Sequence, residues 1–131
     1  SRGLRLGILA PDEHAWKTTA NWLRANLRHY GMSDVVGPIR FVPMHSSEEE
    51  ESLIGNTTLS CADVDEKFRE RLINSAVPVA LKLLEDDEAQ AILFGCTLWG
   101  GMIESISSHV PALCLDPVIT ALRCAEMQAS L

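Results

Sequence analysis

The sequence Ala91-Ile92-Leu93-Phe94-Gly95 is a short apolar run that contains no polar side chain. Such a run is typical of a β-strand buried on both faces, as in a parallel sheet. Residues 4–10 and 111–115 form two further short runs that are mostly apolar. Residues 35–44 also read as a strand, and Gly37-Pro38 within it indicates an irregular start or an edge position. The sequence therefore predicts four strands.

Helical patterns separate these strands. Asp12 begins an apolar stripe at helical spacing that stops at Gly31. The residues of this stripe are Trp16, Ala20, Leu23, Leu27 and Tyr30. Residues 102–109 predict a short helix, and Asp116-Pro117 supplies an N-cap and an N1 proline for a last helix. That last helix carries an apolar stripe of Val118, Leu122 and Ala125.

The clearest helical pattern begins at Asp63. Asp63 and Glu66 form a variant of the capping box. An apolar stripe follows, and its residues are Val64, Phe68, Leu72, Ala76, Val79 and Leu83. Pro78 lies inside this helix and is expected to kink it, or to split it near Asn74, whose carbonyl the proline ring crowds.

Strands that alternate with helices predict an α/β fold, here a single three-layer domain over residues 1–131. With right-handed crossovers, the simplest four-stranded parallel sheet has the order 2-1-3-4. Ligands bind such sheets beyond the carboxyl ends of the strands. Three segments meet this condition, namely residues 11–14, 96–101 and 116–117.

The composition and net charge of the chain limit the kinds of molecule that it can bind. The chain has 131 residues, is 47% hydrophobic and carries a formal charge of −7. This charge argues against general binding to nucleic acid or to an anionic membrane, because both need a basic face. The chain lacks a membrane-spanning apolar run and a signal-peptide pattern, so we expect a cytoplasmic protein. Its opening Ser1-Arg2-Gly3 suggests a fragment whose own start has been removed.

The four cysteines stand at positions 61, 96, 114 and 124, and no two form a CxxC pair. Zinc ligation is therefore unsupported, no metal site is predicted, and reduced thiols are expected. Cys61 lies in a polar segment, Cys114 in a predicted strand and Cys124 in a predicted helix. Cys114 and Cys124 are accordingly expected in the core.

Two functions that are common in α/β proteins are disfavoured, namely nucleotide binding and phosphate acceptance by a receiver domain. A flavin-phosphate or dinucleotide site needs a glycine- or hydroxyl-rich loop after the first strand, whereas residues 10–14 are acidic and contain no glycine. A phospho-acceptor receiver domain needs an aspartate at the end of the third strand, where Cys96 stands instead.

Cys96 follows a buried strand and precedes a Gly-Gly turn that leads into a helix. Backbone N–H groups at such a turn lower the pKa of a thiol and also hold a carboxylate. From its position, Cys96 is either a catalytic thiolate or a buried structural thiol.

The segments around this cysteine resemble a known superfamily. Ala91-Ile92-Leu93-Phe94-Gly95-Cys96-Thr97, followed by Val110-Pro111-Ala112-Leu113-Cys114-Leu115-Asp116-Pro117-Val118, resembles the second-cysteine region of the aspartate/glutamate/hydantoin racemase superfamily. The strand–helix opening over residues 4–30 also resembles the start of the same half. The resemblance therefore spans most of the chain.

The resemblance implies a cofactor-independent isomerase that acts on a small-molecule carboxylate or a hydantoin-type substrate. Two cysteines face the substrate's Cα from opposite sides; one thiolate removes the α-proton and the other thiol returns a proton. Cys96 matches the cysteine of the second half, and Thr97 would hold the substrate's carboxylate or ring carbonyl. Decarboxylases and isomerases of the superfamily use the same cysteine.

The chain departs from this pattern because it carries only one half and no earlier motif cysteine. A complete two-thiol site needs a missing N-terminal half or a second copy, so we expect a homo-oligomer or an absent half. The alternative function is a non-catalytic interaction module whose sheet edge or helix face pairs with another chain.

Four more residues are candidates for substrate binding. Pro11 and His14 follow the first strand, and His14 is alternatively a solvated residue of the first helical turn. Trp99 either walls a pocket or packs a helix onto the sheet. Asp116 is interpreted first as a helix cap and second as a ligand contact.

Residues 45–60, which include four consecutive acids, predict a solvated loop, or alternatively a mobile lid.

Overall fold

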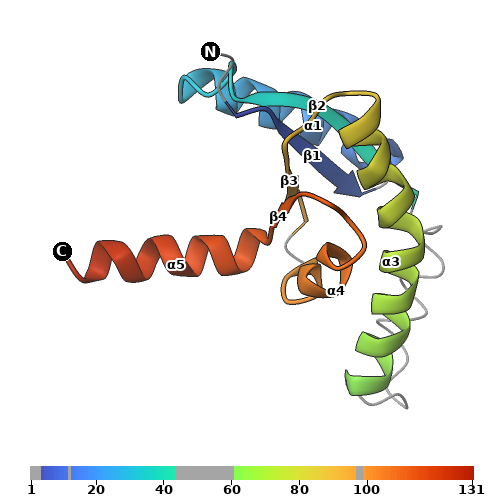
Figure 1. The fold of residues 1–131 in the computed structure, drawn as a ribbon. Coiled ribbons are helices and arrows are strands. Elements are labelled where there is room, and N and C mark those ends of the chain that lie inside the picture. Colours follow the sequence, from blue (N-terminus) through green and yellow to red (C-terminus); the bar gives the residue numbers. More distant parts are fainter. Residues whose placement is uncertain (1–3, 12, 44–60, 97–98) are drawn as a thin grey trace.

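The computed structural model describes residues 4–11, 13–43, 61–96 and 99–131, with the backbone only for residues 13–20, 61–65, 67 and 68. In this part of the chain, four strands form one parallel sheet in the order β2-β1-β3-β4 (Figure 1). The strands are β1 (Leu6–Pro11), β2 (Val36–Val42), β3 (Ala91–Phe94) and β4 (Leu113–Leu115). The predicted α/β fold and strand order are confirmed.

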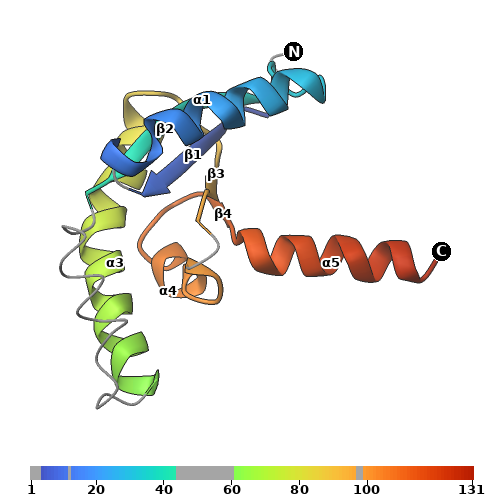
Figure 2. The same ribbon diagram turned by 180° about the vertical axis from the view of Figure 1, so that it is seen from behind.

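Helices lie on both faces of this sheet. The described helices are α1 (Glu13–His29), α3 (Cys61–Glu85), α4 (Ile103–Ser107) and α5 (Pro117–Ala129). Helix α1 packs on β1 and β2 from one face, and α3 and α4 cover the other (Figures 1 and 2). As predicted, α1 stops at Gly31, which has a φ of 69°, a backbone conformation that glycine adopts without strain.

The main core lies between the sheet and the two helices α3 and α4. Its largest fully buried side chains include Leu9, Leu72, Leu83, Ile92, Phe94, Trp99 and Ile106. Burying each large apolar side chain contributes about 1.5–3 kcal/mol to stability. This core therefore fixes β3 and the start of the segment that follows it.

Strand β2 occupies the edge next to β1, as its Gly37-Pro38 dipeptide predicted. The pairing of β1 with β2 shifts register between Leu6 and Ile8, opposite this dipeptide. Proline has no N–H to donate, so an edge position and an irregular register both accommodate it.

The predicted start of α3 is wrong. Asp63 lies inside the helix, which already includes Cys61, so Asp63 does not begin it as a capping box would require. Of the two outcomes expected at Pro78, a kink or a split near Asn74, the split does not occur, because the helix continues through Pro78. Its packing accounts for this continuity, because the predicted stripe residues Leu72, Ala76 and Leu83 are fully buried.

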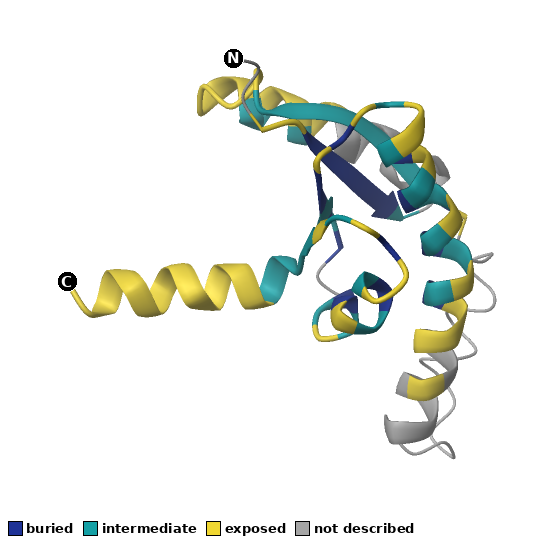
Figure 3. Cartoon of the chain, viewed as in Figure 1, coloured by how far each residue is buried: buried dark blue, intermediate teal, exposed yellow. Residues whose placement is uncertain are grey.

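The last helix also differs from expectation. All of α5 is described, and none of its residues is buried, although Val118, Leu122 and Ala125 were predicted to form its core-facing stripe (Figure 3). Tyr30, the last residue of the stripe predicted for the first helix, follows α1 and is exposed as well. Apolar periodicity identified helical faces here, but it did not identify what covers them.

Among the described residues, no helix combines the length and the apolar character that crossing a membrane requires. Residues 45–60 lie outside the described residues.

Candidate functional site

The carboxyl ends of β1, β3 and β4 lie side by side at one edge of the sheet. Leu9 of β1 is paired with Phe94 of β3, and Pro11 and Cys96 each follow two residues later, at the same edge of the sheet. On the other side, Leu93 is paired with Leu115, which brings Asp116 to this edge too. Three segments predicted from sequence to form a site therefore meet at one edge.

Cys96 is held where β3 leaves the sheet. The backbone N–H of Gly95 donates to the carbonyl oxygen of Leu9 at 2.7 Å, and the N–H of Trp99 donates to the carbonyl oxygen of Cys96 at 3.2 Å. A Cβ atom at position 95 would lie 3.0 Å from that Leu9 oxygen, which is tighter than ordinary contact. Gly95 thus permits the close approach that fixes Cys96.

Cys96 is 6% exposed and is part of the main core. Helix α4 begins at Ile103, seven residues further along the chain, so the helix terminus does not directly follow the thiol. Backbone N–H groups that lower the pKa of the Cys96 thiol would therefore have to come from the segment between Cys96 and Ile103, and not from the first turn of α4. Thr97, the predicted substrate-binding residue of that segment, lies outside the described residues.

Trp99 packs in the core. Its residue is 2% exposed, and its indole meets the ring of Phe94 edge to face, with centroids 6.1 Å apart and an interplanar angle of 77°. Trp99 was expected either to form the wall of a pocket or to pack onto the sheet, and this contact is the packing role. Trp99 therefore anchors the chain three residues after Cys96.

Pro11 is half-buried at the end of β1 and is paired with Val42 of β2. His14 lies in the first turn of α1, as predicted, and its side chain is outside the described part of the molecule. These two positions belong to the same sheet edge as Cys96.

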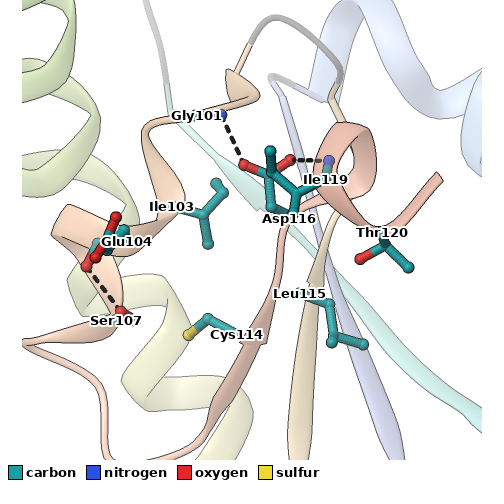
Figure 4. Close-up of a pocket in the computed structure, with 9 residues that line it drawn as sticks. All are labelled: Gly101, Ile103, Glu104, Ser107, Cys114, Leu115, Asp116, Ile119 and Thr120. Carbon is teal, nitrogen blue, oxygen red and sulfur yellow. Dashed lines mark hydrogen bonds between the residues drawn. The ribbon is translucent and has the colours of Figure 1, made fainter. Parts of the chain in front are cut away.

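Asp116 is the N-cap of α5, as its sequence context predicted. One carboxylate oxygen accepts hydrogen bonds from the backbone N–H groups of Val118 at 2.9 Å and Ile119 at 3.1 Å. The other accepts from the N–H of Gly101 at 2.7 Å (Figure 4). Both oxygens are therefore engaged within the protein, so ligand contact by Asp116 would compete with these bonds.

Sequence reasoning missed a cavity of about 470 Å³ beside Asp116, between α4, β4 and α5. Figure 4 shows the residues that line it, which are Gly101, Ile103, Glu104, Ser107, Cys114, Leu115, Asp116, Ile119 and Thr120. Cys96 is not among them. The cavity depends on how β4 and α5 sit against α4, and no local sequence signal reports that arrangement.

The other two described cysteines differ from each other in their positions. Cys124 is exposed on α5, so its predicted core position is wrong, because α5 does not pack on the sheet. Cys114 lies in β4, is half-buried and packs against the main core, as predicted. Burial raises the pKa of its thiol, which makes it a poor source of thiolate at neutral pH. In the described part of the chain, Cys96, Cys114 and Cys124 are not joined by disulfides.

An ion pair among the described residues lies away from this edge. The guanidinium of Arg40 on β2 donates two hydrogen bonds to the carboxylate of Asp87, one of them from Nη2 to Oδ1 at 3.1 Å. The hydrogen bond from Arg40 lowers the pKa of Asp87. Asp86 lies 3.6 Å from the same guanidinium. This pair joins β2 to the turn after α3.

Among the described residues, no group of three or more histidine, cysteine, aspartate or glutamate side chains is arranged to hold a metal ion. Comparisons with protein-family models, with curated proteins and with solved structures found no match for this chain.

Proposed function

We propose that this chain is one half of a cofactor-independent racemase or epimerase, in which Cys96 exchanges the α-proton of an amino acid or a hydantoin-type ring. The observation that carries the proposal is the position of Cys96, two residues after the central strand β3, at the sheet edge where β1 ends with Pro11. Ligands of parallel α/β sheets bind at this edge. The resemblance of residues 91–97 and 110–118 to the racemase superfamily supplies the reaction class.

In the proposed reaction, the Cys96 thiolate attacks the hydrogen on the substrate's Cα. The Cα–H bond breaks, an S–H bond forms, and the electron pair moves into the adjacent carboxylate or ring carbonyl. The resemblance assigns Thr97 to hold that oxygen while its negative charge develops. The developing charge is what the protein must stabilise, because a carbon acid of this kind is very weak.

Racemisation also requires a second acid on the opposite face of Cα. The superfamily uses a cysteine from the other half of the site. Neither Cys114, whose pKa is raised by burial, nor Cys124, exposed on α5, lies at the edge that holds Cys96. The resemblance therefore assigns the second acid of this proposal to another chain or to a preceding half.

A single thiolate can still exchange the α-proton with solvent, and this gives a direct test. We would incubate the chain in deuterium oxide with aspartate, glutamate and a 5-substituted hydantoin, and measure deuterium at Cα by proton NMR. The account predicts incorporation into at least one substrate, its loss in Cys96→Ala and its retention in Cys124→Ser. Equal incorporation with Cys96→Ala, or none with the unmodified chain, would contradict the proposal.

A non-catalytic interaction module is the second candidate function. The observation that favours it is the exposure of α5, together with Leu113 of β4, which is 61% exposed. In the deuterium experiment this candidate predicts no incorporation by any form of the chain.

A further inference from the structure

Two consecutive glycines, Gly100 and Gly101, lie between Trp99 and the start of α4 at Ile103. Glycine has more backbone freedom than any other residue, so such a pair does not fix its own path. Gly101 has a φ of 81°. Apart from its chain neighbours, no heavy atom of the described residues lies within 4 Å of the place that a Cβ on Gly101 would occupy. Packing on that side therefore does not hold Gly101.

A hydrogen bond from its own backbone holds Gly101 instead. The N–H of Gly101 donates to the carboxylate of Asp116 at 2.7 Å, as Figure 4 shows. This length is at the short end of the range for hydrogen bonds to a charged acceptor, which are stronger than those between neutral groups. Asp116 belongs to the start of α5, 15 residues further along the chain. A side chain from the end of β4 thus restrains the two glycines that follow β3.

Backbone hydrogen bonds connect these glycines to Cys96. The N–H of Met102 donates to the carbonyl oxygen of Trp99 at 3.0 Å, and the N–H of Trp99 donates to the carbonyl oxygen of Cys96 at 3.2 Å. Gly101 lies between Trp99 and Met102 in the chain, so a movement of Gly101 disturbs the first of these bonds directly. A continuous set of contacts therefore leads from Asp116 to Cys96.

The two carboxylate oxygens of Asp116 have separate tasks. Oδ1 accepts from the N–H groups of Val118 and Ile119 and so caps α5, whereas Oδ2 accepts from Gly101. A helix cap needs one acceptor oxygen, since serine and threonine serve as caps. Helix α5 therefore does not require the second oxygen, which is the one that holds the glycines.

We propose that Asp116 is a positioning residue for Cys96. Its second oxygen fixes the path of Gly100 and Gly101, and with it the orientation of the backbone N–H groups that favour a thiolate at Cys96. Such groups stabilise negative charge best when their orientation is fixed before the charge develops. Asp116 acts through this turn and does not contact the substrate. The inference rests on the proposed function, because it assigns Asp116 a role toward the Cys96 thiolate.

Three substitutions of Asp116 separate the two tasks. Asp116→Asn keeps one acceptor oxygen for the cap, and its amide nitrogen cannot accept a hydrogen bond from Gly101. Asp116→Ser also caps α5 with a single oxygen. Asp116→Ala loses the cap and the bond to Gly101 together. Glu104→Gln is the matched control, since Glu104 lines the same cavity and its substitution removes a negative charge without touching Gly101.

The measurement is the rate at which iodoacetamide alkylates Cys96 between pH 5 and pH 9, followed by peptide mapping. The pH midpoint of this rate reports the pKa of the thiol, whereas access to the thiol changes only the maximal rate. For the unmodified chain we expect a midpoint below the ordinary thiol value of about 8.5. All three Asp116 variants should move the midpoint upward, toward that value. Urea denaturation should show a clear loss of stability for Asp116→Ala alone, and Glu104→Gln should keep the unmodified midpoint.

A change at the glycine gives a second, independent variant. Gly101→Ala keeps the Asp116 carboxylate and removes no charge. Alanine adopts a φ of 81° only with strain, so the turn has to change its path. We expect the midpoint for Cys96 to rise in this variant as well.

The direction of the change separates positioning from a direct effect of charge. Removal of a negative charge near a thiol lowers its pKa, so a downward shift in the Asp116 variants would overturn the proposal. An unchanged midpoint in Asp116→Asn and Asp116→Ser would also overturn it, even if Asp116→Ala differs, because Asp116 would then be a helix cap only. A midpoint near 8.5 in the unmodified chain, or no labelling of Cys96, would contradict the proposed function itself and the positioning role with it.

Discussion

The Asp116 carboxylate and the backbone N–H of Gly101 lie 2.7 Å apart, in hydrogen-bond contact across the sheet edge that holds Cys96. Asp116 begins α5, and Gly101 belongs to the turn that follows Cys96 and Trp99. One side chain therefore ties the segment after β3 to the segment after β4. The cap of α5 and the position of the candidate site are coupled through it.

We expect Asp116→Ala to lower the free energy of unfolding by about 1–2 kcal/mol, because it removes a helix cap and leaves the Gly101 N–H without its carboxylate. Asp116→Asn should cost less, since its amide oxygen can still accept from the helix N-terminus. Urea denaturation followed by circular dichroism measures both. Glu126→Ala removes another carboxylate from α5 and should change stability little, because its pair with Arg123 is exposed. Equal effects of Asp116→Ala and Glu126→Ala would contradict the capping role.

The pair of Arg40 and Asp87 predicts a dependence of stability on pH. The hydrogen bond from Arg40 lowers the pKa of Asp87 in the folded state, so the carboxylate contributes stability above the ordinary aspartate pKa of about 3.9. That contribution is lost as the pH falls through the lowered pKa. We expect Asp87→Asn to be less stable than the unmodified chain at pH 6 and the difference to shrink below pH 4. A difference that is constant from pH 6 to pH 3 would contradict this.

Gly95 gives a test of how tightly the candidate site is held. Its added Cβ would lie 3.0 Å from the backbone oxygen of Leu9 and 3.3 Å from Cγ2 of Ile8. We therefore expect Gly95→Ala to lower the free energy of unfolding by about 1–3 kcal/mol, the usual cost of overpacking. Thermal denaturation measures this change. Unaltered stability would indicate that β3 can move away from β1 at little cost, and that Cys96 is less firmly placed than described.

The features that were predicted correctly from the sequence are those that depend on residues close together in the chain. The cap at Asp116 needs only an aspartate followed by a proline at the start of an apolar helix, and the structure confirms it. The order of the strands was also predictable, because buried apolar runs alternate with helices and crossovers are right-handed. The placement of Pro11 and Cys96 at one edge of the sheet follows from that order, because β1 and β3 are parallel neighbours.

Features that depend on contacts distant in sequence were not predictable. Leu122 and Cys124 lie on an apolar helix, and the pattern indicated burial, yet both are exposed because the sheet does not cover α5. Asp63 matched a capping pattern but lies inside a longer helix, since local polar residues do not fix where a packed helix begins. The cavity beside Asp116 arises from the spacing of α4, β4 and α5, which no short motif encodes.

The central claim is that Cys96 is a reactive thiolate and not a structural thiol, and the rate of its alkylation in the folded protein tests this most directly. Brief treatment with iodoacetamide at neutral pH, followed by peptide mapping, compares Cys96 with the exposed Cys124 and the half-buried Cys114 in one sample. The account predicts that Cys96 is alkylated at least as fast as Cys124 although it is only 6% exposed, and that Cys114 is slowest, because burial raises its pKa. If Cys96 stays unlabelled while Cys124 reacts fully, Cys96 is a buried core residue and the proposed racemase-like site is wrong.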